Sequence, residues 1–286
     1  YFLGALFLFL EIVLGTSIVA IIKYFSSDVS LAIVLMFRYL FCLPILLIAG
    51  LAIGGTRYFK IKNKKIMSLR SVAGLFGLLF WYLSVIHLDI SKALALSQVM
   101  PIFICMLSIL FLGEKVGFFR WSAILVGLSG AVIIINPDTE GWYSVGLLYI
   151  FLGTLFASIM FVALRRLGMT ENAVATAFWY NLFGSIIFST YCLAALTLNN
   201  ISIDIWIMLV IIGVMASAQQ IFMALSHTYA SASSLAPVHY TTIPIGVFIG
   251  LLVFNERIDL NFLIGSFFIV GSTLFIFYRE KKKTSS

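Results

Sequence analysis

Charged side chains are scarce in this sequence. Only 10% of its 286 residues are Asp, Glu, Lys or Arg, and 62% are hydrophobic, whereas soluble domains carry roughly 25% charged residues. Apolar stretches follow one another from end to end, each close to the ~20 residues that an α-helix needs to cross a bilayer. This scarcity of charge excludes an aqueous fold and predicts an all-α polytopic membrane protein.

Cysteines and catalytic motifs are few or missing as well. Cys42, Cys105 and Cys192 each lie alone in an apolar run, which leaves no CxxC pattern for a metal or redox site. There is no HExxH or GxSxG motif and no pair of intramembrane acids, so we do not expect an enzyme. We expect no catalytic residue, metal or cofactor. The net charge of +7 indicates membrane orientation rather than nucleic-acid binding.

The apolar runs predict ten transmembrane helices, because backbone groups in lipid must bond within their own helix. The connections between them are short, and none is long enough to form a soluble domain. The predicted spans are 1–24, 31–53, 69–87, 93–113, 118–135, 145–164, 173–196, 203–226, 235–254 and 260–278.

Lysine and arginine then predict the orientation of the chain. With a cytoplasmic N-terminus, fourteen basic residues fall in inside connections and three, Lys23, Lys92 and Arg257, in outside ones. Basic residues collect on the cytoplasmic side of membrane proteins. The sequence therefore predicts a multi-pass protein with both termini in the cytoplasm, and we expect its membrane to be a bacterial inner membrane.

The two halves of the chain match each other without gaps at an offset of 142 residues. Lys23 falls on Arg165, residues 83–84 on residues 225–226 (Leu-Ser in both), and residues 114–115 (Glu-Lys) on residues 256–257 (Glu-Arg). Since each half contains five spans, the second half enters the membrane from the opposite side. We predict two inverted five-helix repeats, 1–137 and 143–286, of the kind that places a transport site between the halves.

Several motifs resemble the drug/metabolite transporter superfamily, EamA type. They are "FRYL" at 37–40, "LALSQVMPIFICMLSILFLGEKVGFFRWSAILVGLSGAVIIINP" at 94–137, and its second-half counterpart "TTIPIGVFIGLLVFNERIDLNFLIGSFFIVG" at 241–271. The resemblance implies a cavity lined by helices 1–4 and 6–9, peripheral helices 5 and 10, and secondary transport of small organic metabolites. The spacing is also similar to a subgroup that takes up S-adenosylmethionine.

One carboxylate, Glu11, lies near the middle of the first span. A central acid costs about 2.5–3.5 kcal/mol on insertion scales, so such residues are usually functional or paired. The intramembrane basic residue that could reach it is Arg38 in the second span. Two interpretations stay open: a static Glu11–Arg38 ion pair, or a carboxylate that contacts a cationic substrate group or carries a proton.

Aromatic and amide side chains supply the other candidates for substrate binding. Tyrosine and tryptophan rings bind flat rings and cations well, although core packing is the alternative for each of them, as interhelical hydrogen bonding is for the amides. Two prolines interrupt helical hydrogen bonding and are candidate gating hinges or static kinks. With Glu11 and Arg38, the candidates are Trp81, Tyr82, Gln98, Trp179, Tyr180, Asn181, Gln219, Gln220, His239 and Tyr240; the candidate hinges are Pro101 and Pro244.

Together these features predict a carrier that works by alternating access. Its expected partners are the lipid bilayer, a small amino-acid-like substrate that is zwitterionic or cationic, such as S-adenosylmethionine, a coupling proton or exchange metabolite, and a second copy in a homodimer; nucleic acid is not among them. The alternatives are an exporter of amino acids or drug-like compounds, a channel, or a membrane protein without transport activity.

Overall fold

The structure is a computed structural model, and every element in its described residues is helical. These residues are 2–100, 102–104, 106–107, 118–135, 144–168, 170–195, 202–229 and 238–284. The helices are α1 (Phe2–Tyr24), α2 (Leu31–Gly54), η1 (Gly55–Phe59), α3 (Lys64–His87), α4 (Ile90–Ser97), α6 (Phe118–Ile135), α8 (Val145–Leu167), α9 (Ala173–Ala194), α10 (Ile203–Tyr229), α12 (Thr242–Phe254) and α13 (Leu260–Thr284).

The apolar helices confirm a polytopic membrane protein. Within the described residues, α1, α2, α3, α8, α9 and α10 are long and apolar enough to cross a membrane, and shorter apolar helices lie at 90–104, 121–135, 242–254 and 260–272. These segments correspond in position to the ten predicted spans. The third begins earlier than predicted, at Lys64, because Asn63 Oδ1 accepts a hydrogen bond from Ile66 N at 3.2 Å and caps the helix.

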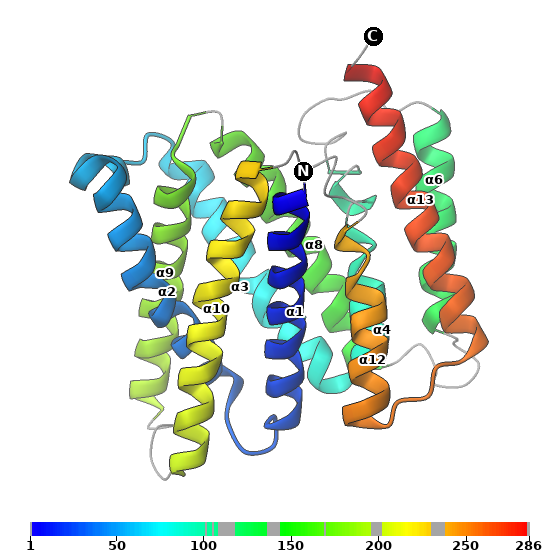
Figure 1. Cartoon of the computed structure of the whole chain (residues 1–286), viewed down its shortest axis with the longest axis horizontal. Coiled ribbons are helices and arrows are strands. Elements are labelled where there is room, and N and C mark those ends of the chain that lie inside the picture. Colours follow the sequence, from blue (N-terminus) through cyan, green and yellow to red (C-terminus); the bar gives the residue numbers. More distant parts are fainter. Residues whose placement is uncertain are drawn as a thin grey trace.

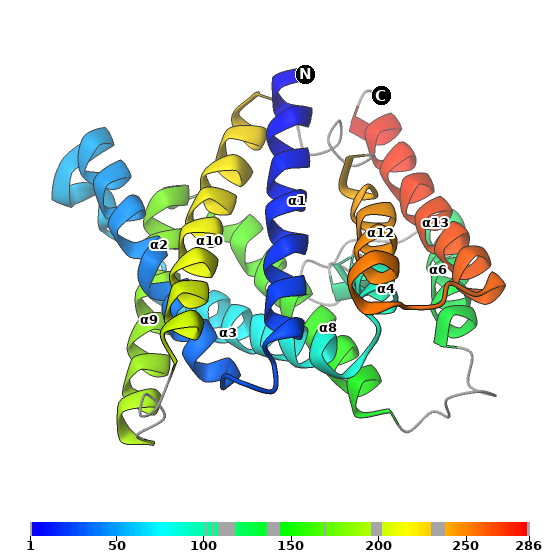
Figure 2. The ribbon, with the colours of Figure 1, turned by 60° about the horizontal axis from the view of Figure 1, so that its bottom comes forward.

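The helices form a single bundle, in which α1 begins and α13 ends on the same side (Figure 1). We call the side that holds the start of α1 and the end of α13 the terminal face, and the side at which α1 ends the far face. In both views α6 and α13 lie at one edge of the bundle and α2 and α9 at the other (Figure 2). The fifth and tenth spans are therefore peripheral.

Helices pack in a regular set of pairs. The most extensive contacts join α3 to α8, α6 to α13, α1 to α10, α2 to α9, and α2 to α10, and α4 also packs against α12. Between α3 and α8 the backbones approach closely, since a Cβ added to Gly77 would lie 3.0 Å from Ala157 N and one added to Gly153 would lie 2.9 Å from Trp81 N. Small residues allow such contacts in membranes, where lipid leaves little hydrophobic driving force between helices.

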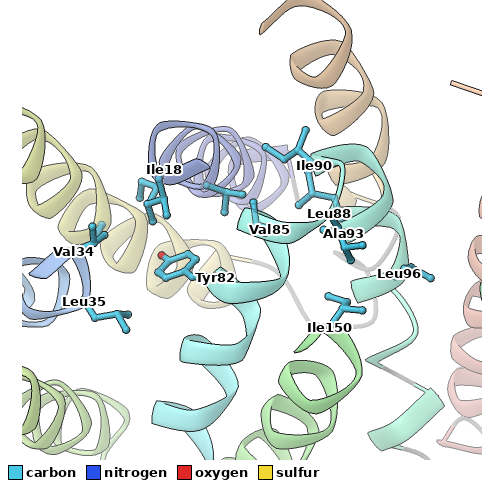
Figure 3. Packing of buried hydrophobic residues seen from close by; sticks show 14 of the residues in the cluster. Ile18, Val34, Leu35, Tyr82, Val85, Leu88, Ile90, Ala93, Leu96 and Ile150 are labelled. Atoms are coloured by element: carbon cyan, nitrogen blue, oxygen red, sulfur yellow. The ribbon is translucent and has the colours of Figure 1, made fainter. Parts of the chain in front are cut away.

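The buried core lies where α1, α2, α3, α4 and α8 meet. Figure 3 shows Ile18, Val34, Tyr82, Val85 and Ile150 there, and each has at most 4% of its surface exposed. Close packing of branched aliphatic side chains holds these helices in fixed positions, and Tyr82 carries the only polar group among the side chains labelled in Figure 3.

Two spans differ from the continuous helices that the sequence predicts. The fourth stops at Ser97 with a turn at Gln98–Val99, and the ninth has a turn at Tyr240–Thr241 before α12 begins. Pro244 lies in the first turn of α12, where its missing N–H removes no intrahelical bond. Pro101 lies outside the described residues. Both breaks therefore precede a proline, as the restriction on residues before proline favours.

Candidate functional site

Glu11 contacts the second half of the chain through an amide. Gln219 Nε2, on α10, donates a hydrogen bond of 2.7 Å to Glu11 Oε1 on α1. Both side chains are partly buried. Gly15, one turn further along α1, leaves the space for this contact, because a Cβ there would lie 2.6 Å from Gln219 Nε2. Sequence analysis selected both residues, but it did not identify them as partners.

Arg38 contacts tyrosines rather than Glu11. Within the described part of the chain, the ion pairs are Lys23–Glu256 and Lys92–Asp89, and neither includes Glu11 or Arg38. Arg38 Cζ lies 5.8 Å from the centre of the Tyr82 ring. The static Glu11–Arg38 pair, one of the two interpretations drawn from the sequence, is thus not among these contacts.

A second buried arginine, Arg70, was missed by sequence analysis. It lies in α3 with its guanidinium carbon 4.5 Å from the centre of the Tyr180 ring on α9. The third span was predicted to begin at Leu69, so Arg70 fell at its very edge and was counted with the charges of the preceding connection. Recognising Asn63 as a helix cap would have placed Arg70 in the second turn of the helix instead of at its edge.

Tyr180 connects α9 to both α2 and α3. Its hydroxyl lies 2.9 Å from the Tyr39 hydroxyl and donates to Gly74 O at 3.2 Å. The neighbouring Asn181 is fully buried and donates from Nδ2 to Ala177 O, one turn earlier, at 2.9 Å. Tyr180 thus belongs to a polar cluster, whereas the Asn181 amide bonds its own helix.

The two tryptophan candidates lie apart from this cluster. Trp179 Nε1 donates to Phe59 O in η1 at 2.8 Å, which ties α9 to the connection after α2. Trp81 is partly buried and packs against the hydrophobic core. Core packing and anchoring account for these contacts, and a substrate-binding role for either residue stays a prediction.

Three polar candidates lie at or beside the helix breaks. Gln98 is in the turn after α4 and Tyr240 in the turn before α12; both are partly buried, while His239 beside Tyr240 is exposed. Each turn is closed by a three-residue backbone hydrogen bond, Val99 N to Leu96 O at 3.1 Å and Thr241 N to Val238 O at 3.0 Å. Such breaks leave backbone N–H and C=O groups near the turn without helical partners, so that they can bind other polar groups.

Gln220, next to Gln219 on α10, is also partly buried.

A carboxylate from the second half binds the first half at the far face. Glu256, with 8% of its surface exposed, receives hydrogen bonds from Lys23 Nζ at 3.2 Å, Ser91 N at 3.0 Å and Ser91 Oγ at 2.7 Å, and from Ile90 N. Ile90 and Ser91 begin α4, whose cap residue Asp89 makes no side-chain capping bond. Glu256 therefore caps α4 from another part of the chain.

Glu171 makes a similar contact on the terminal face. It accepts hydrogen bonds from Asn63 N at 2.9 Å and from Lys62 N at 3.1 Å. Burial raises the pKa of Glu171, but these N–H groups, the Thr170 hydroxyl and the Lys62 charge together bring it below its ordinary value. The charged form is therefore favoured in the folded protein.

The Glu171 contact predicts a pH-dependent contribution to stability. A carboxylate with a lowered folded pKa stabilises fully above its unfolded pKa of about 4.3 and loses this effect as the pH falls through the folded pKa. We expect Glu171→Gln to lower the thermal unfolding midpoint in detergent at pH 7, and we expect this difference to shrink as the pH falls below the unfolded pKa of about 4.3. A difference that stays the same over this pH range would mean that charge plays no part.

The described residues contain no group of three His, Cys, Asp or Glu side chains that could hold a metal ion. The polar groups that they do bring together are a carboxylate with an amide, and two guanidinium groups with tyrosines. Such groups bind charged and hydrogen-bonding parts of organic molecules and need no metal.

Comparison with known proteins gives consistent matches over the whole chain. The model of the EamA-like transporter family matches residues 2–136 and 144–278. The S-adenosylmethionine uptake transporter of Rickettsia conorii is 25% identical over 282 residues, covering 99% of this chain and 95% of the relative. That of Rickettsia bellii is 25% identical and covers 100% and 97%.

Two further similarities concern another named substrate and the fold. The riboflavin transporter of Brucella anthropi is 28% identical over 231 residues, which cover 79% of this chain and 81% of the relative. A solved crystal structure with 16% identity aligns with a TM-score of 0.67 over 95% of this chain and 96% of its own. The latter similarity shows a shared fold.

Proposed function

Because the chain belongs to the EamA-like transporter family, we propose that it takes up S-adenosylmethionine, or a closely related zwitterionic or cationic metabolite, by alternating access. The protein is a transporter with several membrane spans. The bacterial relatives support a bacterial inner membrane, and the excess of basic residues on one side favours both termini in the cytoplasm.

The observation that carries alternating access is the position of the two helix breaks. The turns at 98–99 and 240–241 are separated by 142 residues, the same offset at which the two halves of the sequence match. The two family matches also begin at this spacing, at residues 2 and 144. Discontinuous helices at corresponding positions of two inverted repeats are where many transporters bind substrate, near the middle of the bilayer.

The pairing of helices supports inverted repeats as well. If α1 corresponds to α8 and α3 to α10, then the α3–α8 and α1–α10 pairs are equivalent. The pairs α2–α9, α4–α12 and α6–α13 each join a helix to its own counterpart. A pseudo-twofold axis in the membrane plane would produce this set of pairs, and it would give two similar states, each open to one side.

The chemistry of the site favours a substrate with a positive group. Glu11 places a carboxylate within the bundle, where a cation is attracted more strongly than in water. S-adenosylmethionine carries a sulfonium and an ammonium group, and its uptake transporters in Rickettsia match nearly the whole of this chain. The riboflavin transporter matches a smaller part, and riboflavin has no cation for Glu11 to bind.

Counterflow in proteoliposomes tests this proposal. Vesicles preloaded with unlabelled S-adenosylmethionine should accumulate the labelled compound transiently, with saturation, and excess riboflavin outside should not compete. Absence of counterflow together with an ionic conductance would indicate a channel. Counterflow of riboflavin alone would retain the carrier mechanism and reject the proposed substrate.

A further inference from the structure

Two arginine side chains are buried inside the bundle. Arg38 has 8% of its surface exposed and Arg70 has 6%. Arg38 lies seven residues into α2, which begins at the far face, and Arg70 lies six residues into α3, which begins at the terminal face. At 1.5 Å per residue, each Cα is about 10 Å along its helix from the first residue of that helix. The two arginines therefore lie inside helices that begin at opposite faces of the bundle.

The contacts of the two guanidinium groups in the described residues are tyrosine side chains and include no carboxylate. Arg38 lies against Tyr82 and Arg70 against Tyr180. The ion pairs of the described residues involve neither arginine. Three buried nitrogen atoms, Arg38 Nε, Arg70 Nε and Arg70 Nη1, have no hydrogen-bond partner. Ring faces attract a cation but accept few of its five N–H donors.

The Tyr39 and Tyr180 hydroxyls connect the two arginines, while the Tyr82 hydroxyl itself accepts a hydrogen bond from Arg38. Tyr39, adjacent to Arg38, shares a 2.9 Å hydrogen bond with Tyr180, whose ring faces Arg70. The Tyr180 hydroxyl also donates to Gly74 O. The result is a continuous cluster from α2 through α9 to α3, which contains two positive charges and unused N–H donors.

We propose that Arg38 and Arg70 form the subsite for an anionic group, a carboxylate or a phosphate, on the transported metabolite. An intramembrane charge is costly and usually marks a substrate pathway or has a partner, and neither arginine has an anionic partner in the described residues. The planar fork of N–H donors matches carboxylate and phosphate oxygens in a bidentate geometry. An anion at this cluster satisfies the three unpartnered nitrogens and neutralises buried charge.

This inference rests on the proposed function and narrows its substrate class. Because Glu11 binds a positive group and the two arginines bind a negative group, the protein selects a zwitterion over a simple cation. S-adenosylmethionine can bind Glu11 through its ammonium or sulfonium group and the arginines through its carboxylate. Riboflavin has neither a carboxylate nor a phosphate, so it leaves the arginines unpartnered.

The test compares two ligands that differ only in the carboxylate. S-adenosylmethionine and decarboxylated S-adenosylmethionine compete for counterflow in vesicles of neutral phosphatidylcholine and phosphatidylethanolamine. We expect the first to half-saturate at a concentration at least about tenfold lower, as a charge-assisted bond of about 1.5 kcal/mol implies. Arg38→Gln and Arg70→Gln should each remove this preference by weakening S-adenosylmethionine and leaving the decarboxylated compound unchanged.

Matched variants separate recognition from folding. Arg38→Lys and Arg70→Lys keep the charge but lose the fork, and they should retain part of the preference. Arg57→Gln, which removes an exposed arginine of η1, should leave both ligands unaffected. Equal half-saturation of the two ligands by the unsubstituted protein, or an equal loss for both in the arginine variants, would overturn the inference.

Two further experiments separate the possible outcomes. One asks whether the bound anion belongs to a lipid headgroup or to the substrate, and the other asks whether the subsite or the proposed substrate is wrong. If phosphatidylglycerol stimulates transport only when the arginines are present, and no carboxylate preference exists, the anion is a lipid headgroup and the substrate assignment fails. If S-adenosylmethionine is not moved, the proposed substrate fails, and amino acids are then screened against their methyl esters. Transport restricted to compounds without a carboxylate or phosphate rejects the subsite, whereas a preference for the free acids that requires Arg38 and Arg70 supports it.

Discussion

Replacing Glu11 with glutamine is expected to lower counterflow of S-adenosylmethionine severalfold while the protein still inserts and purifies. Glutamine has the same shape, and its amide oxygen can still accept the hydrogen bond from Gln219 Nε2 that Glu11 Oε1 accepts at 2.7 Å. What is lost is the negative charge. A hydrogen bond to a charged group contributes about 1.5–3 kcal/mol, and the lower value corresponds to about tenfold in affinity.

A companion variant tests the geometry of the pair without removing a polar group. In Gly15→Ala the new methyl would lie 2.6 Å from Gln219 Nε2, and because this atom is at the end of a flexible side chain, the amide moves away from Glu11. Transport should fall, by less than in Glu11→Gln. The control is Gly271→Ala, whose added methyl meets nothing within 4 Å. Unchanged kinetics in both site variants would remove the pair from the mechanism.

Within the described residues, the positions of the helices and much of their extent were predictable, and the reason is physical. In lipid a span must be apolar over about 20 residues and must close its own hydrogen bonds. The runs that end at Tyr24, His87 and Phe254 therefore end where the helices do. Both breaks in the fourth and ninth spans were less visible, because proline indicates an interruption without fixing the residue at which the helix stops.

The partners of the polar groups could not be predicted in the same way. In a soluble helix the apolar stripe identifies the buried face, but a membrane helix is apolar on all sides. The sequence therefore identified Glu11, Arg38 and Gln219 as unusual without showing that Glu11 contacts Gln219 rather than Arg38. The role of Arg70 was missed because the helix start was predicted five residues too late, which left this cation at the edge of the span, where it was counted with the loop charges.

The second large effect is expected at the far face, where Glu256→Gln should destabilise the contact between the two halves. Glu256 accepts hydrogen bonds from the first two N–H groups of α4, from Ser91 Oγ and from Lys23 Nζ. Glutamine replaces one acceptor oxygen with a donor, so at least one buried N–H group loses its partner, at a cost of about 1–3 kcal/mol. The thermal unfolding midpoint should fall, and the far face should open more often.

Opening can be measured by labelling a cysteine introduced at Ser97, beside the break in the fourth span, with an impermeant maleimide applied from the far face. With the three native cysteines replaced by alanine, Glu256→Gln should label faster than its parent, because weakening the closed state raises the population of the open one. Asp89→Asn is the matched control: it removes an ion pair of 3.6 Å at the same face, but Asp89 is 44% exposed, and such pairs contribute little. If Glu256→Gln labels and unfolds like Asp89→Asn, Glu256 does not hold the far face closed, and the barrier between the two open states must lie elsewhere in the bundle.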